Sequence, residues 1–431
     1  MNNVHISTSA TAHPSAEGVV VQPQVPAPAG ETNLLGESLA NRTRLYSVDL
    51  LRGLVMVIMA LDHVRDFFHF GGFDPTDLTK TNTALFMTRW VTHFCAPVFV
   101  FLAGTGAFLS TSRGKTKPEL ARFLLTRGLW LVILELTIVQ FAWFFDYDYK
   151  YGSGAGVIWA IGWSMVALAV LVFLPTWAMT LFGVVMIATH NLFDGVRSES
   201  FGSFSWLWTI LHSGGQLEIV PGVWFFVLYP LIPWIGVMAA GYGFGALLLF
   251  EHDKRRKWLL SIGSALPLAF IIIRAINFYG DPHPWSEQGS SLFTFFSFIN
   301  FEKYPPSLLF LLVTLGLAIA ALALFDRRRE PGAFARALII FGRVPLFYYI
   351  LHLCLIHLLA VVFAYARYGQ AQFLFETPKP PAFPFNAPEG YGYSLPVVYL
   401  VWLAVVLMLY PVCRWFAGVK RRRRDAWLSY L

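Results

Sequence analysis

Residues 45–70 read LYSVDLLRGLVMVIMALDHVRDFFHF, and this stretch decides the fold class of the chain. Its first part, from Leu50 to Leu61, is mostly apolar, with Arg52 and Gly53 as its interruptions. An apolar run of this kind is typical of a membrane-spanning helix whose polar groups gather at its ends. A cluster of titratable side chains follows at once: Asp62, His63, Arg65, Asp66 and His69.

Most of this polar cluster lies on one side of the expected helix. Four of its members are spaced i, i+3, i+4 and i+7, which is one helical face: Asp62, Arg65, Asp66 and His69. His63 lies roughly 100° from Asp62, on the flank of that face. Titratable groups at the end of a membrane helix are costly and usually serve a function. We therefore predict that this helix carries the functional site.

The composition of the whole chain also indicates a membrane protein. Of its 431 residues, 56% are hydrophobic and only 13% are charged, and the mean hydropathy is +0.58. A soluble domain needs more charge to cover its surface. We predict an all-α integral membrane protein, a polytopic bundle of about ten transmembrane helices. No phosphate loop, nucleotide-binding fold or nucleophilic-serine elbow is present, and no nucleic-acid partner is indicated.

Ten apolar segments are candidate spans. They are approximately residues 48–68, 84–110, 122–145, 156–174, 176–191, 222–250, 258–279, 306–325, 344–366 and 395–417. The three cysteines all lie within predicted spans and lack the spacing of a zinc site, so we expect no metal: Cys95, Cys354 and Cys413.

Positive charge assigns the two sides of the membrane. Basic clusters follow the second, sixth, eighth and tenth spans, whereas the opposite loops are mainly acidic. By the positive-inside rule the clusters lie in the cytoplasm, so we expect both termini there. Residues 1–41, rich in Ala, Pro and Ser, are expected to form a disordered cytoplasmic tail, and residues 420–431 a basic cytoplasmic tail.

This orientation brings histidines together near the outer face. His93 opens the second span, and we expect it at the depth of His63 on an adjacent helix. A carboxylate beside an imidazole orients it and raises its basicity, as general-base catalysis requires. The alternative interpretation is that these groups cap helices and contact lipid headgroups, and the identity of the base stays open. The candidate catalytic residues are His63, His93, Asp62, Asp66 and His69.

Several other residues in or beside the predicted spans also have more than one possible role. Glu135 stands in mid-span, where a carboxyl group either functions or bonds a neighbouring helix. His352 and His357 lie about 140° apart on a helix, so we expect interhelical hydrogen bonds rather than a metal pair. Arg343 precedes Pro345 at the cytoplasmic mouth and either binds phosphate or sets topology. The small residues 104–106 indicate close helix packing or a narrow channel.

Three segments carry a resemblance to a known family: RLYSVDLLRGLVMVIMALDHVRDFF (44–68), THFCAPVFVFLAGTGAFL (92–109) and FGRVPLFYYILHL (341–353). With them the chain resembles bacterial proteins that have the heparan-alpha-glucosaminide N-acetyltransferase catalytic domain, over most of residues 42–417. The resemblance implies a transmembrane acyltransferase domain at residues 42–419. Such an enzyme takes acetyl from cytoplasmic acetyl-CoA and delivers it to a glycan or amino-sugar acceptor on the far side, here of the bacterial inner membrane. A homodimer is compatible with it.

The motif residues carry over with some departures. The match includes Arg44, Ser47, Asp49, Arg52 and Gly53. His63 stands where the animal enzyme has an asparagine, and His93 where it has an aspartate. The catalytic histidine of the animal enzyme lies in the first outer loop, where this chain offers only His69 as a loose counterpart.

The donor is expected at the cytoplasmic mouth, where acyl-CoA phosphates need cations. The candidate donor-binding residues are Arg52, Arg113, Lys115 and Arg343. The main alternative is a transporter or exporter in which the buried charges bind solute or relay protons. Transporters often contain an internal repeat of spans, and none is evident between residues 45–190 and 222–417, which favours the enzyme.

Reporter fusions test the predicted topology. Fusions after residues 117, 256 and 328 should report the cytoplasm, because they lie in or beside the basic clusters. Fusions near residues 75, 148 and 285 should report the outside. Paired reporters, each active on one side only, provide the measurement. If the fusions at 75 and 117 reported the same side, the predicted spans would be wrong.

Overall fold

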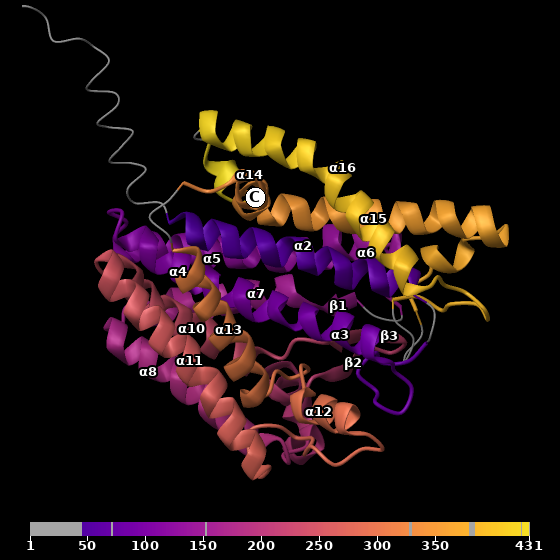
Figure 1. The fold of residues 1–431 in the computed structure, drawn as a ribbon, viewed down its shortest axis with the longest axis horizontal. Coiled ribbons are helices and arrows are strands. Elements are labelled where there is room, and N and C mark those ends of the chain that lie inside the picture. Colours follow the sequence, from indigo (N-terminus) through magenta and orange to yellow (C-terminus); the bar gives the residue numbers. More distant parts are fainter. Residues whose placement is uncertain are drawn as a thin grey trace, which may run out of the picture. The chain divides into compact units, whose positions relative to one another are not determined.

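The computed structural model describes residues 45–69, 72–150, 153–326, 330–378, 384–423 and 425–430. The tail expected at residues 1–41 lies outside this described part. From Tyr46 onward the chain clusters as one unit, and this unit is built mainly of helices (Figure 1).

The helices follow the apolar segments of the sequence. They are α2 (Tyr46–Phe68), α3 (Thr83–Val91), α4 (Cys95–Thr111), α5 (Lys117–Leu134), α6 (Gln140–Phe144), α7 (Val157–Leu171), α8 (Thr176–Thr189), α9 (Ser205–Trp208), α10 (Leu231–Phe244), α11 (His252–Ile276), α12 (Ser291–Ile299), α13 (Leu308–Phe325), α14 (Ala333–Arg343), α15 (Pro345–Tyr368) and α16 (Leu395–Arg422). A 3₁₀ turn joins α3 to α4, and a π-helical segment, Glu135–Val139, joins α5 to α6.

The predicted fold class is confirmed. Within the described residues, eight continuous helical segments are long and apolar enough to cross a membrane. This is fewer than the expected count of about ten, because α2 and α7 are not among them. Helix α2 carries charged residues at both ends, and α7 has only 15 residues. The chain is therefore a helical integral membrane protein.

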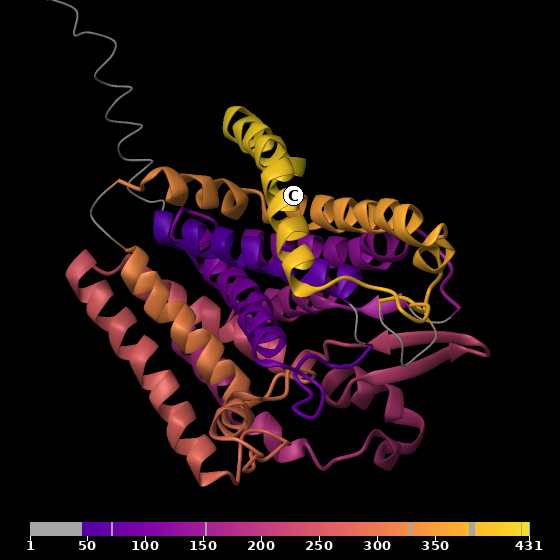
Figure 2. The same cartoon turned by 45° about the vertical axis from the view of Figure 1, so that its right-hand side comes forward.

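One expected span begins later than the sequence predicted. The stretch from residue 222 was expected to be helical, but it contributes to a hairpin of β2 (Gly215–Val220) and β3 (Val223–Val227). Strand β3, VWFFV, is made of β-branched and aromatic residues, which favour a strand. The short strand β1 (Ser153–Ala155) pairs with β3 in parallel, so the sheet order is β1-β3-β2. Figure 2 shows this hairpin beside the ends of the helices.

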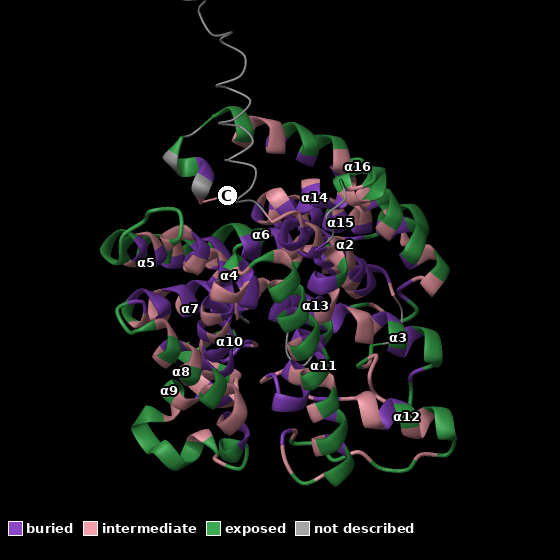
Figure 3. Cartoon of the chain, turned by 60° about the vertical axis from the view of Figure 1, so that its left-hand side comes forward, coloured by how far each residue is buried: buried purple, intermediate pink, exposed green. Residues whose placement is uncertain are grey.

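Helix α2 lies in the interior of the bundle. It packs against α4, α13, α14, α15 and α16, and Figure 3 shows buried residues gathered where α2, α14 and α15 lie side by side. A Cβ atom at Gly53 would lie 1.8 Å from the carbonyl oxygen of Leu338, and one at Gly342 would lie 1.9 Å from that of Asp49. These two glycines let the backbones of α2 and α14 touch, as small residues do between membrane helices.

The small residues of α4 divide into a packed position and an open one. A Cβ atom at Gly104 would lie 2.0 Å from the carbonyl oxygen of Met238 in α10, and the Thr105 hydroxyl donates to the carbonyl of Gly241 at 2.9 Å. A Cβ atom at Gly106 would meet nothing within 4 Å. Close helix packing therefore explains Gly104 but leaves Gly106 to another role.

This difference predicts opposite effects for two matched substitutions. Gly106→Ala should stabilise the protein slightly, because alanine has the higher helix propensity and space is open, by about 0.5–1 kcal/mol. Gly104→Ala should destabilise it by about 1–3 kcal/mol, because the methyl group meets backbone. Thermal unfolding in detergent, followed by tryptophan fluorescence, provides the measurement. A shift in the same direction for both variants would contradict the described α4–α10 contact.

Candidate active site between two opposed cavities

The end of α2 that carries the polar cluster is held by a buried charge network. Asp62 forms ion pairs with Arg65 at 2.6 Å and with Arg89 of α3 at 3.1 Å, and it accepts a hydrogen bond from the Thr92 hydroxyl at 2.8 Å. Arg65 also pairs with Asp66 at 2.6 Å. Asp62 and Asp66 are therefore engaged by guanidinium groups, and no hydrogen bond joins either carboxylate to His63.

A cavity of about 500 Å³ opens beside this network, and we call it the histidine cavity. It lies among α2, the α5–α6 segment, the sheet, the loop before α13 and α15. Its lining includes Asp62, His63, Asp66, Glu135, Gln140, Trp143, Gly156, Val157, Gln216, Tyr229, Lys303, Tyr304 and Tyr349. The lining thus combines carboxyl, imidazole, amine and phenol groups, which is the composition of an acid–base site.

His63 is oriented by a second histidine. Its Nδ1 atom lies 2.7 Å from Nε2 of His352, whose own Nδ1 lies 3.0 Å from the carbonyl oxygen of Tyr348. A carbonyl only accepts, so when both rings are neutral Nδ1 of His352 carries the proton and its Nε2 accepts from His63. This arrangement leaves Nε2 of His63 with a free lone pair. His63 therefore has the tautomer that a general base needs.

His93 faces a different cavity. This side cavity, of about 210 Å³, includes in its lining Asp74, Arg89, His93, Arg274, His283, Glu302, Lys303 and Tyr304. The His93 ring packs on Phe301 and Phe310, and its Nδ1 atom is buried without a hydrogen-bond partner in the described part of the chain. His63 and His93 thus occupy adjacent cavities that share Lys303 and Tyr304. His69 lines neither cavity, and its Nδ1 lies 3.3 Å from the carbonyl oxygen of Tyr393.

Lys303 and Tyr304 are site residues that the sequence analysis missed. Lys303 is only 6% exposed, and its ammonium group lies 5.0 Å from the centre of the Tyr304 ring. Burial raises the pKa of Tyr304, but the charges of Lys303 and Arg89 outweigh burial and hold it below its usual value. For neighbouring Tyr229, burial raises the pKa. The sequence signal that could have indicated this pair is Lys303 itself, a single lysine in an expected outer loop that has few basic residues.

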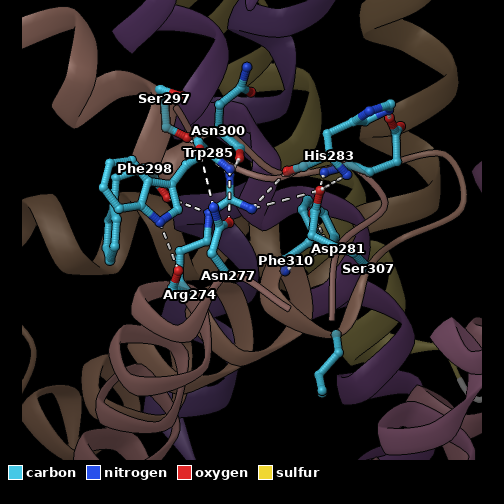
Figure 4. A network of polar contacts seen from close by, with 12 residues as sticks. Arg274, Asn277, Asp281, His283, Trp285, Ser297, Phe298, Asn300, Ser307 and Phe310 are labelled. Carbon is cyan, nitrogen blue, oxygen red and sulfur yellow. Dashed lines mark hydrogen bonds and ion pairs between the residues drawn. The ribbon is translucent and has the colours of Figure 1, made fainter. Parts of the chain in front are cut away.

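A second polar network fixes the loop that carries Lys303 and Tyr304 (Figure 4). Arg274 of α11 is buried and donates to four backbone carbonyls, those of His283, Ser297, Phe298 and Asn300. The Asp281 carboxylate accepts from the Glu302 amide at 2.8 Å and from the Ser307 hydroxyl at 2.7 Å. Residues 300–307 are therefore anchored before and after Lys303 and Tyr304.

A third cavity, of about 320 Å³, lies near the other end of α2, and we call it the basic cavity. Four cationic side chains line it: Arg52, Arg127, Arg343 and Lys420. Ala103, Gly106 and Ala107 of α4 line it as well, which gives Gly106 its open surroundings. Arg113 and Lys115, although expected near Arg52 and Arg343, are exposed and outside this lining; Lys115 stacks on Phe123.

The histidine cavity and the basic cavity share two wall residues. Val157, at the start of α7, and Tyr349 of α15 line both cavities. The Tyr349 ring lies 6.1 Å from the His63 ring, centre to centre. We call this shared wall the neck. It places the half-buried His63 imidazole one side chain away from a cavity lined by cations.

The fold and the cavities define a polytopic membrane protein with a cavity lined by titratable side chains inside its helical bundle. Residues 44–280 match the family model described as heparan-alpha-glucosaminide N-acetyltransferase, catalytic, and this is more than half of the chain. The chain belongs to that family of membrane acetyltransferases. The matched part contains His63, His93 and Glu135 but ends before Lys303, Arg343 and His352. A comparison with curated proteins gives no match.

Proposed function

We propose that this protein transfers an acetyl or related acyl group from cytoplasmic acyl-CoA to a sugar or amino-sugar acceptor at the outer face of the membrane. The observation that supports this most directly is the neck. Val157 and Tyr349 separate a cavity suited to a polyanionic donor from one suited to proton transfer. Transfer of the acyl group across such a wall needs no large movement of the donor or of the acceptor. Membership of the acetyltransferase family favours this function over transport.

The basic cavity suits the donor. Coenzyme A carries its phosphates at one end of a long, thin arm whose other end holds the thioester. Guanidinium groups pair well with phosphates, and Arg52, Arg127 and Arg343 face this cavity together. The small residues of α4 leave room for the arm beside them. The basic clusters of the sequence support our proposal that this end of the bundle faces the cytoplasm, and we propose the bacterial inner membrane as its location.

The histidine cavity suits the acceptor and its deprotonation. In the proposed step, Nε2 of His63 takes the proton of an acceptor N–H or O–H as that atom attacks the thioester carbonyl. The carbonyl carbon then loses the sulfur as a thiolate, which has to gain one proton for CoA to leave as the thiol, just as His63 has to lose the proton it has taken. His352 acts through His63 as a positioning residue, because it fixes the tautomer. Asp62 and Asp66 line the cavity and are held by the guanidinium group of Arg65. The Nδ1 atom of His93, which has no hydrogen-bond partner in the described residues, is the second candidate base.

Donor binding should depend on the basic cavity. Arg343→Ala or Arg52→Ala should weaken acyl-CoA binding, because each removes a cation that faces the donor phosphates. The exposed Arg113, outside the cavity lining, provides the matched control as Arg113→Ala. Calorimetric titration of the detergent-solubilised protein with CoA gives the affinities. Equal affinities for all three variants and the wild type would remove the basic cavity from the donor site.

Transfer itself should depend on His63. His63→Ala should reduce the rate by about a hundred- to ten-thousand-fold, as expected for the loss of a general base, while CoA binding persists. The assay is acyl transfer to supplied amino sugars in proteoliposomes loaded with acetyl-CoA, with the partly exposed His252 replaced by glutamine as control. Full activity in the His63→Ala/His93→Ala double variant would refute this site and direct attention to His69.

A further inference from the structure

Glu135 is a buried carboxyl group that the proposed transfer step leaves without a role. It lies within the continuous helix from Lys117 to Phe144, where the α-helix changes to the π-helical segment Glu135–Val139. Its side chain is 6% exposed and lines the histidine cavity together with His63. In the described part of the chain, no lysine, arginine or histidine forms an ion pair with it. π-Helical segments of this kind are frequent at functional sites.

The two oxygen atoms of this carboxyl group have different surroundings. The group lies beside the first backbone amides of α7, those of Gly156, Ile158 and Trp159. A Cβ atom at Gly156 would lie 2.4 Å from Oε1, so only glycine permits this approach. The second oxygen, Oε2, is buried and has no hydrogen-bond partner in the described residues. Glu135 therefore has one oxygen packed against Gly156 and a second oxygen without a hydrogen-bond partner in the described residues.

The anchoring residue places Glu135 at the neck. Gly156 directly precedes Val157, and Val157 lines both the histidine cavity and the basic cavity. Lys303 and Tyr304, which also hold protons in the histidine cavity, border the side cavity instead. Among these groups, Glu135 is the one joined to the wall through which the donor thioester has to reach His63.

We propose that Glu135 is the general acid that protonates the sulfur of the leaving coenzyme A, an inference that rests on the proposed function. The carbonyl carbon gains a bond to the acceptor atom and loses its bond to sulfur. The acceptor proton passes to Nε2 of His63, and the Glu135 carboxyl proton passes to sulfur. Transfer of one proton from His63 to Glu135 through water in their shared cavity then restores both groups.

The surroundings explain why such an acid is needed. At the neck a thiolate would be flanked by Val157 and the ring of Tyr349, and a charge without partners beside such groups is costly. Protonating the sulfur as the bond breaks avoids this charge. A donor whose thiolate is intrinsically stable should not need the acid, and this difference gives the test.

The experiment compares two donors in the wild-type protein and in Glu135→Gln. Glutamine keeps an oxygen for the amides of α7 but has no proton to give. The donors are acetyl-CoA and S-(4-nitrophenyl) thioacetate, whose leaving thiolate is stabilised by its ring. With acetyl-CoA we expect a rate lower by about a hundredfold or more, and with the nitrophenyl thioester a change of only a few-fold. Gly156→Ala, which displaces the carboxyl group, should show the same dependence on the donor, and the exposed Glu199→Gln should show none.

The outcomes separate this inference from the function on which it rests. An equal fall with both donors would assign Glu135 a structural role, and an unchanged rate with acetyl-CoA would exclude it as the acid. Either result leaves the transferase function intact. If the wild-type protein transferred no acyl group from acetyl-CoA to any supplied acceptor, the proposed function would fail and this inference with it.

Discussion

The structure depends on the neutralisation of Asp62 inside the helical bundle. A charge in a low-dielectric interior is tolerated only when it is paired and hydrogen-bonded, and removing one partner of a buried pair typically costs about 3–5 kcal/mol. Asp62 meets this condition through Arg65, Arg89 and Thr92. Because Arg89 belongs to α3, at the start of the second span, the same network holds α3 against the polar end of α2. The histidine cavity, the side cavity and the loop between them are all arranged around this joint.

The architecture was largely predictable from the sequence, because a lipid environment demands long apolar segments. Each segment expected to span the membrane contains a helix, and the family resemblance is confirmed over residues 44–280. The hairpin at residues 215–227 was not predicted, since the apolar residues of its second strand, β3, run on towards those of α10 without a charged residue between them. A continuous apolar run does not by itself distinguish a strand from a helix.

The candidate site was predictable only in part, for a physical reason. Sequence spacing relates residues on one helix, so it brought together Asp62, Arg65 and Asp66 of α2, although His69 of the same predicted face lies at Tyr393 instead. The spacing of residues in the sequence does not predict contacts between helices that are far apart in the chain. His352 orients His63 across 289 positions of the chain, and Asp62, the nearest carboxylate in sequence, is bound instead by arginines. Lys303 enters the site from a loop whose path is set by Arg274, which no periodicity indicates.

The neck has a further consequence, which concerns electrical insulation. In the proposed orientation, a passage open to both sides at once would let protons flow down the membrane potential, which is worth about 2.3 kcal/mol per charge at 100 mV. Tyr349, which is only 5% exposed, and Val157 are the residues that line both cavities and so form the wall between them. In the proposed function this wall admits an acyl group, so it also has to act as a seal against protons. Widening it to accept a longer acyl chain would bring the enzyme closer to a leaking channel.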